Sequence, residues 1–353
     1  MKKILSIDGG GIRGLIPAMV LTEIERRTNQ PISKSFDLIA GTSTGGILAL
    51  GLSKADESGQ PEFSAKALSE IYTNHGKTIF PQGTWASAAR HLWVGFGMSE
   101  KIYSHQGLEE VLRDKVGNAT LGDALGRVLI STYDIVGGEP VFFKSWDGPH
   151  KAVKMVDVAR ATSAAPTYFE PHQVTITYEK EEYFEKYNLS YKKEKFKKII
   201  VEKVIDGKEM IEKTYTLVDG GICINSPAVS AYAEAKRLFP EEQDFLVLSL
   251  GTGQINPETT YQQARAWGMA SWARPLIKFM FDGVSDVADY QLRNILSGEP
   301  KRYYRMQTDI HEDSGAMDLA SDENILRLIN GATSLIREQD ANLNELCGLL
   351  SGS

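Results

Sequence analysis

Cysteine is scarce in this sequence, and long apolar runs are missing from it. The 353 residues include two cysteines, Cys223 and Cys347, too few for a disulfide framework, and no CxxC or Cys/His spacing indicates a metal site. No stretch reaches the roughly 18 apolar residues of a membrane span, and the N-terminus lacks the apolar segment of a secretory signal. We therefore expect reduced thiols, no bound metal, and a cytoplasmic protein whose contact with lipid is peripheral, at membrane surfaces.

Positive charge is also in the minority. There are 39 Lys and Arg residues against 46 Asp and Glu residues, which gives a net charge of −7. Proteins that bind a nucleic-acid polymer are usually basic, so that class of partner is disfavoured. No internal repeat and no Pro- or Ser-rich linker divides the chain. We expect a single domain over residues 1–353.

Alternating strand and helix signals are what the sequence does contain. Short apolar runs predict buried strands at Ile4 to Ile7, Phe36 to Ala40, Arg127 to Tyr133, Pro140 to Lys144 and Phe245 to Leu250. Helical spacing predicts helices at Leu15 to Arg27, Ile47 to Leu52, Phe63 to Asn74, Gln106 to Val116, from Ser226-Pro227 to about Leu238, and from Ser321 onward. This order is typical of an α/β fold, and we expect a three-layer α/β/α sandwich with a mostly parallel central sheet.

One segment, from about 174 to 217, differs from the rest by its density of Lys, Glu and Tyr. Asp206-Gly207 separates two alternating runs within it, which is a hairpin signal. We expect a solvated hairpin inserted into the domain; the alternative is a basic platform for lipid headgroups around Lys192 to Lys198. A helical C-terminal part is expected from about residue 258.

A glycine loop, GGGIRG at residues 9–14, lies between the first strand and the first helix. Consecutive glycines let several backbone N–H groups point into one space, and the following helix N-terminus favours an anion there. The pattern also matches G-x-G-x-x-G of dinucleotide-binding proteins, a match that is weak by itself. The loop alone leaves three readings open: an oxyanion hole, a phosphate loop or a tight turn.

A G-x-S-x-G motif, Gly41-Thr42-Ser43-Thr44-Gly45, follows the second strand and opens a helix. In that context the turn exposes the serine hydroxyl, and the Thr44 N–H can join an oxyanion hole. The six histidines are His75, His91, His105, His150, His172 and His311. None of them lies in the glycine-bounded turn after a strand that a catalytic base would occupy, and His172 is the hardest to dismiss. Asp219, at the end of the apolar run 216–218 and before two glycines, is the better candidate for the base, although this motif by itself favours a plain Asp-Gly turn.

Three motifs therefore occur in one order: GGGIRG at 9–14, GTSTG at 41–45 and DGG at 219–221. Together they resemble the patatin-like phospholipases. Segments 159–169, 249–253 and 266–290 are similar to further parts of that family, so the resemblance covers nearly the whole chain. The charged segment before DGG is longer than the hairpin of plant members.

The resemblance implies a patatin-like fold and a Ser–Asp dyad without histidine. Ser43 would be the nucleophile and Asp219 would orient it and take its proton. The oxyanion hole would be built from Gly9, Gly10, Gly11, Arg13, Gly14 and Thr44, with Arg13 bracing the loop. It also implies hydrolysis of phospholipid, lysophospholipid or galactolipid esters without calcium or any other cofactor.

Two further features would suit a lipid hydrolase. An apolar set from Trp267 to Phe281, which also includes Trp272, could be an interfacial helix or an ordinary buried pair. Phe80, Trp85, Trp93 and Phe96 could form a lid or a packed loop. Three alternative functions stay open: a nucleotide-binding module that uses GGGIRG, an effector switched on by a partner or small-molecule activator, and a thioesterase or peptidase with the same dyad.

Overall fold

Five parallel strands form the centre of the fold. The computed structural model describes residues 1–80, 106–166, 168–187, 200–255 and 259–352. The parallel strands lie in the order β3 (Arg127–Asp134), β2 (Leu38–Thr42), β1 (Lys2–Ile7), β8 (Phe245–Leu250) and β9 (Tyr303–Met306). The carboxyl ends of parallel strands meet at one edge of a sheet, so β1 and β2 deliver the glycine loop and Ser43 to the same place.

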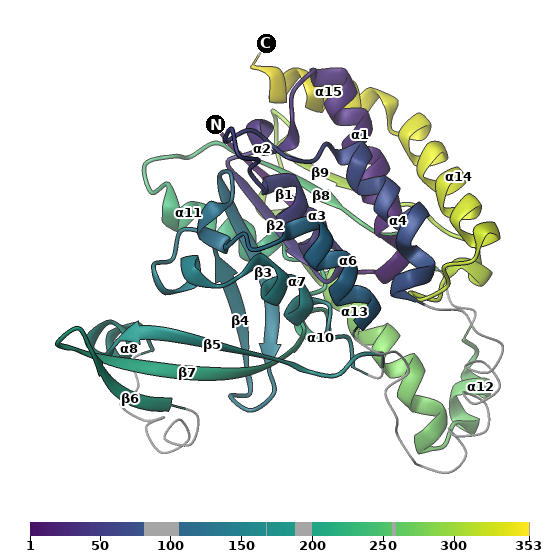
Figure 1. Cartoon of the computed structure of the whole chain (residues 1–353). Helices are drawn as coiled ribbons and strands as arrows, with labels where there is room; N and C mark the ends of the chain where they lie inside the picture. Colours follow the sequence, from purple (N-terminus) through teal and green to yellow (C-terminus); the bar gives the residue numbers. More distant parts are fainter. Residues whose placement is uncertain (81–105, 167, 188–199, 256–258, 353) are drawn as a thin grey trace.

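Helices cover both faces of this sheet (Figure 1). Side chains alternate along β1, so Ile4 packs with Ala228 and Ala231 of one helical layer while Leu5 packs into the core on the opposite face. The expected three-layer α/β/α arrangement is confirmed. On the Leu5 side lie α1 (Leu15–Thr28), α3 (Thr44–Ser53), α4 (Ala65–Ile79), α6 (Gln106–Val116), α7 (Met155–Thr162), α14 (Asp322–Glu338) and α15 (Asp340–Ser351); on the other lie α11 (Ala228–Leu238) and α13 (Met269–Ile295), with α10 (Gly221–Ile224) packed on α13.

Antiparallel strands extend the sheet beyond β3. β7 (Lys208–Asp219) and β4 (Glu139–Lys144) both pair antiparallel with β3, and Asp219 lies opposite Thr132. β5 (His172–Glu179) and β6 (Ile200–Ile205) pair antiparallel with β7. With α8 (Lys180–Tyr187), β5 and β6, the outer part of β7 forms a projecting arm at the lower left of Figure 1. The sheet is therefore mixed around a parallel core.

Several predicted elements have different limits in the structure. The predicted helix at 63–74 becomes α4, which begins after the cap Ser64 and runs to Ile79. The last predicted helix is two helices, α14 and α15, separated at Gln339, and the Ser321 side chain caps the first of them by accepting from the Asn324 N–H. Short helices α2 (Ile32–Ser35) and α12 (Tyr261–Ala266) lie in connections. The proposed platform at 192–198 lies outside the described residues.

Helix α13 is the longest helix in the described part of the chain. Among its described side chains, Phe281 is buried, whereas six large apolar ones are 40–70% exposed: Trp272, Leu276, Met280, Val287, Tyr290 and Ile295. The predicted apolar set is thus partly core and partly surface. Within the described residues, no helix combines the length and the apolarity that crossing a bilayer requires.

Candidate active site

The glycine loop follows β1 directly and is fixed at its base by a buried ion pair. Asp8 Oδ2 lies 2.7 Å from Arg305 Nη2, and Arg305 Nη1 donates to Ser249 Oγ at 2.9 Å. Burial raises the pKa of Asp8, and the adjacent Arg305 opposes that rise. Removing one partner of such a pair leaves an uncompensated buried charge, so this contact constrains where the loop begins.

The first loop residue, Gly9, has both of its backbone groups engaged. Its N–H donates to the Asn225 carbonyl at 3.1 Å, and its carbonyl accepts from Thr252 Oγ1 at 2.8 Å. A Cβ at Gly9 would lie 2.4 Å from Asn225 Oδ1 and 3.1 Å from Ser43 Cβ. Gly9 was expected to donate to an oxyanion. In this structure its N–H is already used, and the residue instead lets the backbone pass close to Ser43.

Gly10 and Gly11 supply the open amides of the loop. Among the described residues, neither N–H has a hydrogen-bond acceptor, whereas the next amide, that of Ile12, donates to the Met317 carbonyl at 2.8 Å. Gly11 has φ +59°, and a Cβ there would lie 2.1 Å from Met317 O. A side chain would clash and would also be strained at this φ, so only glycine fits.

Arg13 and Gly14 support the loop from behind. Arg13 is buried; its Nε donates to the Gly10 carbonyl at 3.3 Å and its Nη1 to the Gly253 carbonyl at 3.2 Å. Gly14 allows α1 to start against Thr44, because a Cβ there would lie 2.3 Å from Thr44 Oγ1. Both residues shape the loop through contacts behind it, and its open amides are those of Gly10 and Gly11.

Ser43 occupies the turn between β2 and α3 in a strained conformation, with φ 55° and ψ −125°. Such backbone angles cost about 1–3 kcal/mol in a non-glycine residue and persist only where the surroundings enforce them. The flanking glycines permit the turn, since a Cβ on Gly41 would lie 2.1 Å from Gly45 O and one on Gly45 would lie 2.2 Å from Ile7 O. The Ser43 N–H donates to Thr162 Oγ1 at 2.8 Å.

Asp219 ends β7 beside this turn and is fully buried. Its Oδ1 accepts from the Gly221 N–H at 2.8 Å. Its Oδ2 is buried and has no hydrogen-bond partner at full geometry among the described residues. Burial raises the pKa of Asp219 to about 7, against the opposing effects of the Ser43 hydroxyl and the Gly221 amide. A carboxyl with this pKa exchanges a proton readily at neutral pH.

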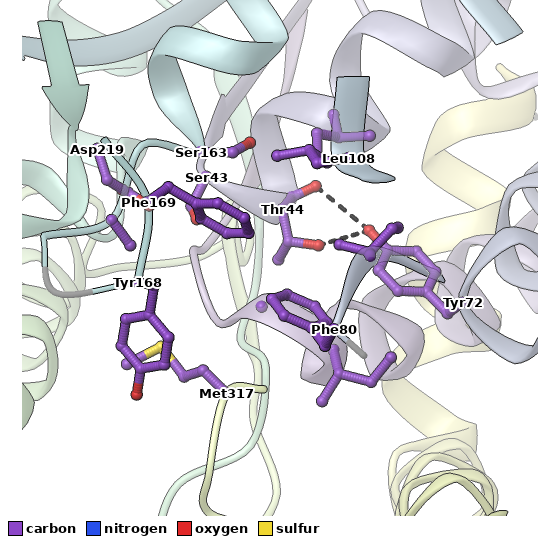
Figure 2. Close-up of a pocket in the computed structure, with 15 residues that line it drawn as sticks. Ser43, Thr44, Tyr72, Phe80, Leu108, Ser163, Tyr168, Phe169, Asp219 and Met317 are labelled. Atoms are coloured by element: carbon purple, nitrogen blue, oxygen red, sulfur yellow. Dashed lines mark hydrogen bonds between the residues drawn. The ribbon is translucent and has the colours of Figure 1, made fainter. Parts of the chain in front are cut away.

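A mostly apolar pocket opens over these groups (Figure 2). Gly11, Ser43, Thr44 and Asp219 line it together with the aromatic and aliphatic residues Tyr72, Phe80, Leu108, Tyr168, Phe169 and Met317, among others. Thr44 Oγ1 and Tyr72 OH are 2.5 Å apart and close one side of it. The structure therefore gathers the predicted serine, aspartate and glycine loop around a cavity suited to a chain of CH₂ groups.

Comparison with known proteins decides the family. The family model described as Patatin-like phospholipase matches residues 5–232, which include all three motifs. The chain belongs to the patatin-like phospholipase family. Patatin-like protein 2 of Arabidopsis thaliana is 31% identical to it, over 97% of this chain and 84% of that protein. Patatin-17 of Solanum cardiophyllum is 29% identical, over 96% of this chain and 84% of that protein. This relation supports lipid acyl hydrolase activity in general terms.

The described histidines of this patatin-like protein do not line the pocket around Ser43 and Asp219. His172 is the first residue of β5, and its Nε2 lies 3.0 Å from Asp157 Oδ1. His150 is buried beside Phe143, and His311 lies 3.3 Å from Asp313. The four described histidines, His75 included, are absent from the pocket lining. His91 and His105 lie outside the described residues, as do Trp85, Trp93 and Phe96 of the proposed lid, whereas Phe80 lines the pocket.

Some residues that hold the site have no motif of their own. Thr162, Asn225, Thr252 and Arg305 contact Ser43, Gly9 or Asp8 from four separate parts of the chain. For Thr162 and Thr252, the only sequence signal was the similarity of segments 159–169 and 249–253 to patatins. Among the described residues, no group of three or more His, Cys, Asp or Glu side chains is arranged to hold a metal ion.

Proposed function

We propose that this protein hydrolyses acyl esters of membrane lipids, with Ser43 as nucleophile and Asp219 as general base. The observation that carries the proposal is the strained Ser43 turn beside a buried carboxyl of pKa about 7. A serine hydroxyl is a weak nucleophile until an adjacent base activates it. An ordinary aspartate has a pKa of about 3.9 and would be a poor base at neutral pH, so burial of Asp219 supplies the missing basicity.

The chemistry proceeds in two halves. In the first, Asp219 Oδ2 takes the Ser43 proton as Oγ attacks the ester carbonyl, and the protonated carboxyl then gives that proton to the departing alcohol. In the second, Asp219 takes a proton from water as the water attacks the acyl-serine, and it gives that proton to Ser43 Oγ as the fatty acid is released. Each half passes through an oxyanion.

The amides of Gly10, Gly11 and Thr44 are the donors proposed for that oxyanion. Thr44 begins α3, where the first N–H groups of a helix have no acceptor within the helix. One such donor is typically worth ~2.7–4 kcal/mol of transition-state stabilisation. The apolar pocket next to Ser43 suits an acyl chain and disfavours a phosphate-binding reading, because a phosphate needs charged or polar surroundings.

Lipid contact is proposed at the exposed apolar face of α13. At 100° per residue, Trp272, Leu276, Met280, Val287 and Tyr290 fall within one narrow arc of the helix. The opposite, buried side of the same helix reaches the site, since the Phe281 ring contacts Gly221, two residues from Asp219; a Cβ on Gly221 would lie 2.3 Å from that ring. Trp272→Ala should weaken binding to phospholipid vesicles while hydrolysis of a water-soluble ester stays constant. Unchanged vesicle binding would remove this part of the proposal.

The deciding experiment compares wild type with Ser43→Ala on two substrates, with EDTA present. A p-nitrophenyl acyl ester series reports ester cleavage, and mixed phospholipid vesicles show which lipid bond is cut. We expect release from both that depends on Ser43 and survives EDTA. A thioester series in the same assay distinguishes the thioesterase alternative. Lack of Ser43-dependent release from every substrate would contradict a constitutive hydrolase and favour the activated-effector or nucleotide-binding alternatives.

A further inference from the structure

One short segment holds both members of the dyad. The Ser43 N–H donates to Thr162 Oγ1 at 2.8 Å, and the Asp219 N–H donates to the Ala164 carbonyl at 3.0 Å. Thr162 is the last residue of α7, and Ala164 follows it by two residues. Ser43 and Asp219 are 176 positions apart in the chain (219 − 43), so their separation depends on contacts of this kind.

The Thr162 hydroxyl is oriented by a second hydrogen bond. It donates to the Ser131 carbonyl on β3 at 2.7 Å, which leaves its oxygen lone pairs facing the Ser43 N–H. Ser131 pairs in register with Thr42, the residue before the nucleophile, and Thr132 pairs with Asp219. A single buried hydroxyl therefore connects the nucleophile turn to the strand that lies between β2 and β7.

The Thr162 methyl group is also packed against the turn. A Cβ on Gly46, in the first turn of α3, would lie 2.8 Å from Thr162 Cγ2. The side chain is fully buried, and it does not line the pocket. It can affect the reaction through Ser43 but has no route to contact an acyl chain.

We infer that Thr162 is a positioning residue that holds the strained Ser43 backbone at the distance and angle required by Asp219. The inference rests on the proposed function, because it assumes that Ser43 and Asp219 react together and that the rate of ester hydrolysis depends on the distance between them. Reaction within a dyad depends steeply on geometry, since the reacting groups must be held near their attack positions. Loss of the hydroxyl should therefore reduce kcat and leave KM nearly constant.

The test compares Thr162→Val, which keeps the shape and removes the hydroxyl, with Thr162→Ser, which keeps the hydroxyl. Thr28→Val is the matched control: Thr28 is also buried, at the end of α1, and its hydroxyl donates to the Ile24 carbonyl at 2.8 Å, away from Ser43 and Asp219. Kinetics on a p-nitrophenyl ester are measured below the onset of thermal unfolding of all variants. Phosphonylation of Ser43 by a fluorophosphonate, followed by mass spectrometry, gives a second rate that needs no turnover.

We expect Thr162→Val to lower both kcat and the phosphonylation rate by about 10- to 100-fold with KM within about twofold, as displacements below 1 Å can do. Thr162→Ser should restore most of the rate, and Thr28→Val should keep the wild-type rate, with any loss confined to thermal stability. A folded Thr162→Val with wild-type rates, or a Thr162→Ser as slow as Thr162→Val, would overturn the inference while the dyad stands. A wild type that neither hydrolyses esters nor is phosphonylated at Ser43 would overturn both.

Discussion

The two ends of β7 have opposite surroundings although they belong to one strand. Lys208, at the outer end, is exposed and lies 2.5 Å from Glu179 in a set of surface ion pairs that also joins Lys180 to Glu202 and Glu209. Asp219, at the inner end, is fully buried and is held by uncharged backbone groups of Ala164 and Gly221. Exposed ion pairs contribute little to stability, whereas a buried carboxyl changes its chemistry. One strand therefore has a solvated ion pair at Lys208 and a buried carboxyl at Asp219.

The sharpest test of this contrast replaces Asp219 at the inner end of β7 and Asp206 in the turn before its outer end. Asp219→Asn should lower ester hydrolysis at least ~10³-fold, because the amide cannot take the Ser43 proton. Asp206→Asn should leave hydrolysis unchanged, since Asp206 is an exposed turn residue at φ 49°, a conformation that asparagine tolerates. Both are measured as kcat/KM with circular dichroism to establish folding. A folded Asp219→Asn with near-full activity would refute the contrast and the dyad together.

A second comparison replaces glycines at positive φ in the two regions. Gly11→Ala should lower kcat by ~10²–10³-fold, because the Cβ would displace the loop from Met317 and misplace the amide proposed as an oxyanion donor. Gly207→Ala places a methyl group in open space at φ +79°. It should cost only about 1–2 kcal/mol of stability from the backbone conformation, with no loss of rate. If Gly11→Ala and Gly207→Ala had equal effects on kcat, the amides of the glycine loop would have no particular role in the reaction.

Acid should switch off the reaction, because protonated Asp219 cannot act as a base. With a pKa of about 7, kcat/KM should fall by about tenfold per unit as pH drops below 7 and level off above it. A profile that stays flat from about pH 5 to 9 would place the base on another group.

The same carboxyl should influence stability in the opposite sense. The folded-state pKa, about 7, is above the ordinary value of 3.8, so between these values the folded protein holds a proton that the unfolded chain releases. Stability is therefore lost as pH rises through that window, by a total on the order of 4 kcal/mol. Asp219→Asn should lack this loss and be the more stable protein at about pH 8 in urea unfolding.

The smallest effect is expected at the exposed end of the strand. Lys208→Gln removes the ion pair with Glu179 without touching a buried group. We expect no resolvable change in Tm or in ester hydrolysis, since screened surface pairs have little net effect. A clear loss of activity would mean that the arm takes part in catalysis or in presenting substrate.

The sequence allowed prediction of those parts of the fold and site that depend on local pattern. Apolar runs placed β1, β2 and β8, and glycine spacing located the loop and the Ser43 turn, because each depends on backbone geometry within a few residues. The dependence of Ser43 on Thr162, and of Gly9 on Asn225, could not be predicted, since these bonds join segments more than 100 positions apart. The N–H of Gly9 was assigned to the oxyanion for that reason. The antiparallel direction of β7 depends equally on its long-range pairing with β3.

The strand that ends at Asp219 also has a consequence for how this enzyme can diversify. Register with β3 fixes the inner end of β7, while its outer turn at Asp206 and Gly207 faces open solvent. Exposed loop tips are where inserted residues are best accepted. Insertions at this tip would lengthen the arm without moving the Asp219 carboxylate. Homologues could therefore carry additional segments there and keep the same active-site geometry. The same turn is a natural place to fuse a reporter.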